Sequence, residues 1–132
     1  MSGRCGSDSS QHEGPLRDRT RQFAIRVIKL VRAINDRQIG NVIGNQVLRS
    51  GTSVGAQYRE ACRARSTAEF ASKVKSAAQE LEETMYWFEL LIASEVVPPR
   101  MMSELEQEAD EILRMLLASE RTARGRKPTE NA

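Results

Sequence analysis

The sequence predicts an all-α protein, an antiparallel up-down-up-down four-helix bundle, and three observations favour that fold class. Apolar residues recur at helical spacing in four successive segments. Proline and glycine are sparse, at 4 and 8 among 132 residues, and no stretch alternates β-branched and aromatic residues as a strand would. Charged residues make up 29% of the chain, as expected for amphipathic helices that each have one solvent-exposed face.

The two ends of the chain are expected to lie outside this bundle. They contain too few apolar side chains to offset the entropy that ordering would cost. We therefore predict a disordered leader over residues 1–15, the four-helix bundle domain over residues 16–122, and a disordered basic tail over residues 123–132.

The four helical segments are defined by their apolar stripes. The first ends near Asn35-Asp36 and Gly40, the second covers about residues 41–65, the third about 67–94, and the fourth about 100–123. Ser66 and Glu69 predict a capping box at the start of the third helix, in which the Glu69 carboxylate accepts a hydrogen bond from the Ser66 amide. Pro98-Pro99 end the same helix. The predicted core contains Phe23, Val27, Leu30, Ile34, Ile43, Val47, Val54, Tyr58, Ala61 or Cys62, Phe70, Val74, Ala77, Leu81, Thr84, Met85, Phe88, Ile92, Met101, Leu105, Ile112, Met115, Leu116 and Leu117, and Ala24, Ile28 and Val31 are predicted to widen the first stripe.

The middle of the second segment is poor in helix-forming residues. Ser50, Gly51, Ser53 and Gly55 fall within six positions, and a glycine costs about 1 kcal/mol relative to alanine inside a helix. Two explanations are open. The helix breaks here, or a neighbouring backbone approaches closely over Gly51 and Gly55, which lie one turn apart. Under the second explanation these small residues are helix-packing positions.

The residues of the common catalytic sites are missing. A di-iron site in a bundle needs a Glu-x-x-His motif on each of two helices, whereas the only histidine is His12, in the leader. Gly40 and Gly44 lack the Gly-Lys-Ser/Thr of a phosphate-binding loop. We therefore predict a protein that is not an enzyme and that has no metal and no cofactor.

The two cysteines and the apolar runs bear on location. Cys5 lies in a Ser/Gly-rich stretch and Cys62 within a helical pattern, so we expect no disulfide between them and a cytoplasmic location. No signal peptide is recognisable, and no apolar run approaches the roughly 20 residues that span a bilayer. We therefore expect neither export nor contact with a membrane.

Charge is distributed unevenly although the net charge is only +2. Residues 14–37 contain seven basic and two acidic residues, and residues 45–76 contain six and two. Residues 79–111 reverse the balance with one basic and ten acidic residues. This asymmetry indicates either a polyanionic partner or head-to-tail contact between subunits.

Basic residues of the second and third helices are the candidate nucleic-acid-binding site. Arginine offers a planar fork that suits phosphate, and binding by many such contacts would weaken steeply with salt. Ordinary surface charge, paired with nearby glutamates, is the competing interpretation. The candidates are Arg49, Arg59, Arg63, Arg65, Lys73 and Lys75.

Three consecutive aromatic residues, Tyr86, Trp87 and Phe88, cannot all face one core, because successive helical residues point about 100° apart. Trp87 is the candidate for a subunit interface, since interfaces favour large amphipathic rings.

Residues 46–94 strongly resemble the family of four helix bundle proteins, also called 23S ribosomal RNA intervening-sequence proteins. The matching blocks are VLRSGTSVGAQYREA at residues 47–61, Arg65-Ser66, Glu69-Phe70, and KVKSAAQELEETMYWFELL at residues 73–91. Weaker similarity extends over the first and fourth helices.

The resemblance implies a four-helix bundle that assembles into a homopentamer and has no enzymatic activity. One branch of the family consists of accessory proteins of diversity-generating retroelements, whose basic surface binds nucleic acid and a reverse transcriptase. The resemblance thus implies three kinds of partner: further copies of this chain, RNA or DNA, and a reverse transcriptase. The alternative interpretation is a structural scaffold that binds protein and no nucleic acid.

Overall fold

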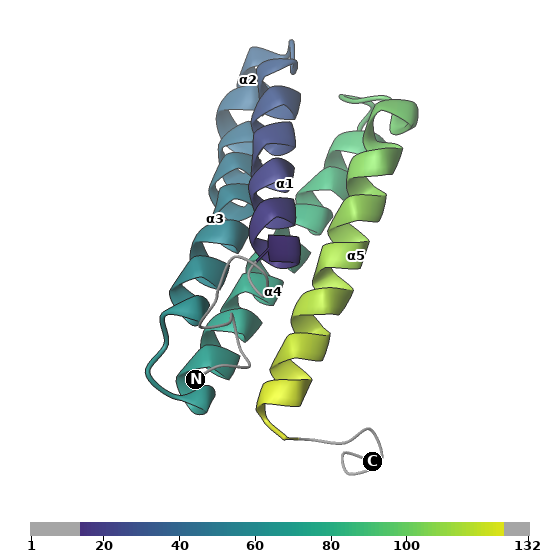
Figure 1. Cartoon of the computed structure of the whole chain (residues 1–132). Helices are drawn as coiled ribbons and strands as arrows, with labels where there is room; N and C mark the ends of the chain where they lie inside the picture. The colour runs from purple at the N-terminus through teal and green to yellow at the C-terminus, as the bar shows by residue number, and fades with distance from the viewer. Residues whose placement is uncertain (1–13, 126–132) are drawn as a thin grey trace.

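Consecutive long helices run in opposite directions and pack side by side (Figure 1). The computed structural model describes residues 14–125, and this part of the chain contains no strand. The helical elements are α1 (Gly14–Arg32), α2 (Arg37–Ile39), the π-helical segment η1 (Gly40–Gly44), α3 (Asn45–Cys62), α4 (Thr67–Ala93) and α5 (Pro99–Ala123). The predicted all-α antiparallel four-helix bundle is confirmed.

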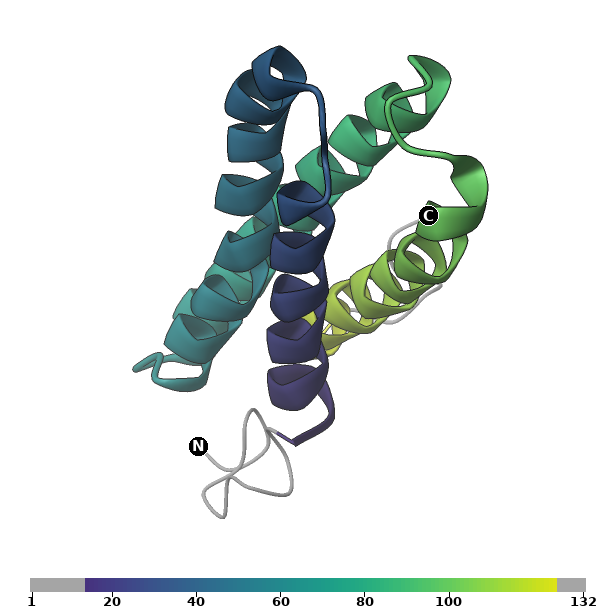
Figure 2. The same cartoon turned by 90° about the horizontal axis from the view of Figure 1, so that it is seen from above.

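The bundle is closed unevenly. The most extensive contacts join α3 to α4, α4 to α5 and α1 to α3, whereas the contact between the neighbouring helices α1 and α5 is smaller. Figure 2 shows α5 inclined to α1. The neighbours of α1 are α3 and α5, so α1 and α4 occupy opposite corners of the bundle. In the centre, Phe23 of α1 meets Phe88 of α4 with ring centroids 6.3 Å apart.

The second long helix begins at Arg37, four residues before the predicted start. Asp36 caps it, since its side chain accepts a hydrogen bond of 3.0 Å from the Ile39 amide. Gly40 was expected to separate the helices, but it has right-handed helical angles (φ −60°, ψ −37°), and α2, η1 and α3 follow one another without a gap. The aspartate cap therefore outweighs the glycine, and the π-helical turns accommodate the transition.

The glycines of α3 allow close approach of α1, and the helix is unbroken from Asn45 to Cys62. A Cβ atom added to Gly51 would lie 3.0 Å from Cγ1 of Val27, and one added to Gly55 would lie 3.1 Å from Oγ1 of Thr20. Of the two explanations for this small-residue run, the structure shows close packing. Nearby, the Thr84 hydroxyl donates a buried hydrogen bond of 2.7 Å to Ser50 Oγ, which joins α3 to α4.

The start of α4 differs in one detail from the predicted capping box. The Glu69 amide donates to Ser66 Oγ at 3.0 Å, as expected. The Glu69 carboxylate, however, accepts from the Arg65 amide at 3.1 Å rather than from the Ser66 amide. The N-cap is Ser66, as predicted, so only the partner of the Glu69 carboxylate differs.

The core follows the predicted helical registers with two errors, at Met101 and at Ile28, which is 40% exposed instead of widening the buried stripe of α1. Met101 is 55% exposed, whereas Met102 is fully buried. Met102 is in register with Leu105 and Ala109, so Met101 points about 100° away from the core. The predicted core residues that are buried are Phe23, Val27, Leu30, Val47, Val54, Tyr58, Ala61, Phe70, Val74, Ala77, Leu81, Thr84, Phe88, Leu105, Ile112 and Leu116, and those that pack on them half-buried are Ile34, Ile43, Cys62, Met85, Ile92, Met115 and Leu117.

The cysteine prediction is contradicted. Cys62 is half-buried at the end of α3 and is disulfide-bonded, not a reduced thiol. The predicted leader and tail lie outside the described residues, as does Cys5, apart from Gly14, Pro15 and residues 123–125. Of these, Gly14 and Pro15 belong to α1, and Ala123 ends α5. No helix within residues 14–125 is long and apolar enough to cross a membrane.

Candidate nucleic-acid interface

The C-terminal turn of α3 and the loop after it gather three arginines. Arg59 and Arg63 lie one helical turn apart on the outer face of α3, and Arg65 follows in the connection to α4. All three are exposed, and none forms a side-chain ion pair with another residue in the range 14–125. We call Arg59, Arg63 and Arg65 the α3 corner. Positive charge at a helix C-terminus is favourable because the last carbonyls carry partial negative charge.

The acid closest in sequence to the α3 corner is already paired. Glu60 lies between Arg59 and Arg63, but its carboxylate accepts a bond of 2.8 Å from the Lys73 ammonium group on α4. This hydrogen bond raises the pKa of Lys73. Lys73 therefore neutralises Glu60, so Glu60 does not offset the positive charge of the α3 corner.

Arg49 is paired too, and belongs to the α3–α4 contact. Its guanidinium bonds to Glu83 at 2.6 Å and to Glu80 at 3.2 Å. The bond to Glu83, more than any other cause, raises the pKa of Arg49, and the same bond lowers the pKa of the Glu83 carboxyl. The structure therefore gives Arg49 a role in holding two helices together.

Lys75 lies apart from the other candidates. It is two residues after Lys73, and two residues turn a helix by about 200°. Because Lys73 faces Glu60 of α3, Lys75 lies on the side of α4 away from α3, where it is exposed. The six candidate residues thus separate into one cluster of three, two ion-paired residues and one isolated lysine.

A second basic surface was not among the predicted site residues. Arg21, Lys29 and Arg32 are exposed on the side of α1 opposite its buried stripe, and none has an ion-pair partner among the described residues. The sequence did contain a signal, because residues 14–37 have seven basic and two acidic residues. Deciding which of them remain unpaired required the positions of the acids on α5.

The other predicted positions have structural contacts. Gly51 and Gly55 face α1, and Ser50 is buried. Ser53 is half-buried, and its hydroxyl donates a hydrogen bond of 2.6 Å to the Arg49 carbonyl oxygen within α3. Trp87 is half-buried, and its Nε1–H donates a hydrogen bond of 3.2 Å to the Glu83 carboxylate. The Tyr86 ring lies 5.4 Å from the Trp87 ring at a tilt of 53°, and Tyr86, at 53% exposure, is the more exposed of the two residues.

The chemistry available at these surfaces is binding of anions. Guanidinium groups donate several hydrogen bonds in a plane and remain charged at any physiological pH, which suits phosphate oxygens. Within residues 14–125 no group of three or more His, Cys, Asp or Glu side chains is placed to hold a metal ion. Fold and surface together define a small helical-bundle protein with a cationic corner at one end of α3.

The chain belongs to the 23S rRNA-intervening sequence protein family, whose sequence model matches residues 16–118. A solved structure from Bacteroides thetaiotaomicron VPI-5482, described as a protein with unknown function from the S23 ribosomal protein family, is similar in fold. Its TM-score is 0.74 and its identity 37%, over 78% of this chain and 95% of that chain. A search of curated proteins finds no match.

Proposed function

We propose that this chain is a non-enzymatic, oligomeric accessory protein that binds RNA or DNA through the α3 corner. The observation that carries the proposal is the gathering of exposed Arg59, Arg63 and Arg65 without ion-pair partners among the described residues, while neighbouring Arg49 and Lys73 are neutralised within the chain. Like charges one turn apart repel each other by a few tenths of a kcal/mol. A polyanion would turn that repulsion into attraction.

A titration with RNA and with duplex DNA at several salt concentrations tests this proposal. For duplex DNA, each phosphate contact contributes about 0.9 to the slope of log K against log salt, so replacing Arg59, Arg63 and Arg65 by Glu should lower the slope by at least ~2.7. Binding should weaken uniformly across sequences, because phosphate contacts carry no sequence information.

The matched control has the same change of charge elsewhere. Arg37, Arg100 and Arg121 are exposed and lie at the start of α2 and at the two ends of α5. Replacing these three by Glu should lower affinity much less than the α3 corner variant does. Equal losses for the two triple variants would show that only net charge matters, and absence of binding by the unaltered protein at low salt would refute the proposal.

The finer parts of the proposal concern partners. By the family resemblance the assembly is a homopentamer and one partner is a reverse transcriptase of a diversity-generating retroelement. Light scattering measures the subunit number, and co-purification with a reverse transcriptase encoded beside this gene tests the second partner. The cytoplasmic location remains a prediction, and it loses the support of the cysteines, since Cys62 is disulfide-bonded.

The alternative function is a protein-binding scaffold without affinity for nucleic acid. Three glutamates around a groove between α4 and α5, Glu82, Glu89 and Glu106, favour it, because acidic residues repel polyanions. A protein that assembles but binds neither RNA nor DNA at low salt would support this alternative.

A further inference from the structure

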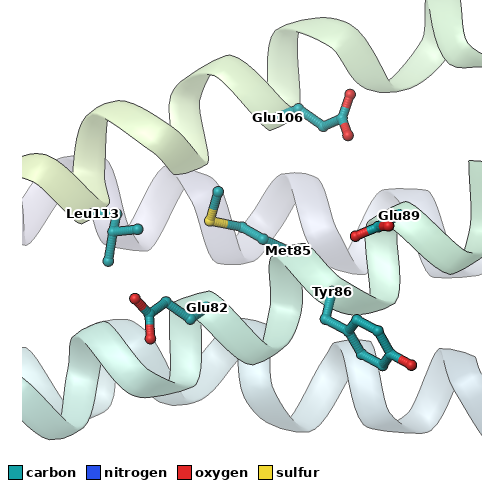
Figure 3. Close-up of a pocket in the computed structure, with 6 residues that line it drawn as sticks. All are labelled: Glu82, Met85, Tyr86, Glu89, Glu106 and Leu113. Atoms are coloured by element: carbon teal, nitrogen blue, oxygen red, sulfur yellow. The ribbon is translucent and has the colours of Figure 1, made fainter.

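A groove of about 520 Å³ runs between α4 and α5 on the outside of the bundle. Its apolar part is formed by Met85, Tyr86 and Leu113, and Tyr86 is 53% exposed. Figure 3 shows Met85 between the two helices, with Glu82 and Glu89 to either side of it along α4 and Glu106 on α5. The groove thus combines an apolar floor with a rim of carboxylates.

The carboxylates of this rim differ from the other acids of the same two helices. Glu82, Glu89 and Glu106 form no ion pair within the described part of the chain. Most of their acidic neighbours do pair. Arg49 binds Glu80 and Glu83, Arg19 binds Glu108 and Glu111, and Arg26, Arg114 and Arg124 bind Glu104, Asp110 and Glu120. The negative charge left uncompensated is therefore concentrated at the groove.

The outer face of α1 has the opposite character. Arg21, Lys29 and Arg32 are exposed and unpaired among residues 14–125, and Ile28 between them is 40% exposed. Residues 21, 28 and 32 share one side of the helix because their spacings of seven and four are close to whole turns. This face combines one exposed apolar side chain with a cationic surround.

We propose that the α4–α5 groove of one copy binds the outer face of α1 of a second copy. Ile28 packs over Met85, Tyr86 and Leu113, and the cations of α1 approach the three unpaired glutamates. The inference rests on the proposed oligomeric function and names the surfaces that would assemble it. Protein interfaces have this organisation, with an apolar centre and a charged rim.

The position of the two faces requires that they come from different copies. Phe23 of α1 and Phe88 of α4 meet across the core, so the outer faces of α1 and α4 point away from each other. A contact between two different surfaces of identical subunits is head-to-tail, and it repeats until a ring closes. The second copy thus supplies the cations that the groove lacks within its own chain.

The α3 corner is the less suitable partner for the groove. The large hydrophobic side chains exposed on the described surface are Ile28, Val42, Tyr86 and Met101, and none of them belongs to the α3 corner. A contact of arginines alone would leave the apolar floor uncovered. The assignment therefore leaves Arg59, Arg63 and Arg65 available to nucleic acid.

Charge reversal in the full-length chain, measured by light scattering without nucleic acid, tests the contact. Glu82→Lys with Glu89→Lys reverses the groove, and Arg21→Glu with Arg32→Glu reverses α1. Each double variant should shift the mass from that of the assembly to that of a single subunit. The variant with all four substitutions should regain the mass of the assembly, because it restores opposite charges on the two faces. Circular dichroism verifies that each variant is helical.

Arg59→Glu with Arg63→Glu is the matched control, since it changes the net charge as the α1 variant does. It should retain the mass of the assembly while losing affinity for nucleic acid. A double variant of either face that keeps the assembly, or a fourfold variant that stays a single subunit, overturns the pairing of these faces. An unaltered protein that is a single subunit in low salt overturns the oligomeric part of the proposed function as well, whereas nucleic-acid binding is measured separately.

Discussion

Replacing Gly51 by alanine is the sharpest test of the contact between α1 and α3. The new Cβ would lie 3.0 and 3.1 Å from the two Cγ atoms of Val27, well inside the usual contact distance of about 3.5–4.0 Å. Val27 is fully buried, and a β-branched side chain has one strongly preferred rotamer in a helix. It therefore has little freedom to move aside.

Two opposing effects determine the magnitude. Overpacking a core costs about 1–3 kcal/mol, and removing a glycine from a helix interior gains about 1 kcal/mol. Gly51→Ala should thus destabilise the protein by up to ~2 kcal/mol. In a Val27→Ala background both Cγ atoms are gone, and the nearest remaining atom is Cβ at 3.4 Å. There Gly51→Ala should stabilise by about 1 kcal/mol, so the effect reverses sign.

Urea unfolding of the unaltered protein, both single variants and the double variant measures this coupling. All four proteins are compared at one protein concentration, because assembly adds to the apparent stability. Gly40→Ala is the control, since its Cβ would lie at an ordinary 3.8 Å from Ile34. If Gly51→Ala has the same effect in both backgrounds within about 0.5 kcal/mol, the close-packing argument is wrong.

Three further predictions concern the polar contacts between helices. Ser50→Ala should cost about 1 kcal/mol in urea unfolding, because it removes the buried bond from Thr84, and in a Thr84→Val background the cost should shrink. The lowered pKa of Glu83 stabilises the fold above the ordinary glutamate pKa, and this stabilisation is lost as pH falls through the lowered value. Because the side chains of this pair are 48% and 36% exposed, Arg49→Met should remove only about 0.5 kcal/mol at neutral pH. If the stability of Arg49→Met falls with decreasing pH as that of the unaltered protein does, the assignment is wrong. Arg19→Met removes bonds of 2.6 and 2.7 Å to α5, and should speed amide hydrogen exchange in α5 more than in α4; equal changes in both helices would argue against a local tie.

The family resemblance and the fold could be anticipated from the sequence, but the composition of the candidate site could not. Six basic residues were equivalent as a linear pattern. In the structure, Arg49 and Lys73 bind acids 34 and 13 residues away, Lys75 faces another side, and only Arg59, Arg63 and Arg65 gather. Whether a cation is free depends on which acid a remote helix brings within about 4 Å, and helical spacing alone does not specify that.

The sequence by itself determined the four helices and most of their buried faces. A period of 3.6 residues is a local property, so Phe23, Val27 and Leu30 define a buried stripe whatever packs on it. Only the tertiary structure decided that Gly51 marks a close approach and not a break, and that Glu82, Glu89 and Glu106 are the acids of α4 and α5 left without a cation around the groove. Both facts depend on distances between side chains of different helices, because contact and charge compensation arise only where the bundle brings remote residues together.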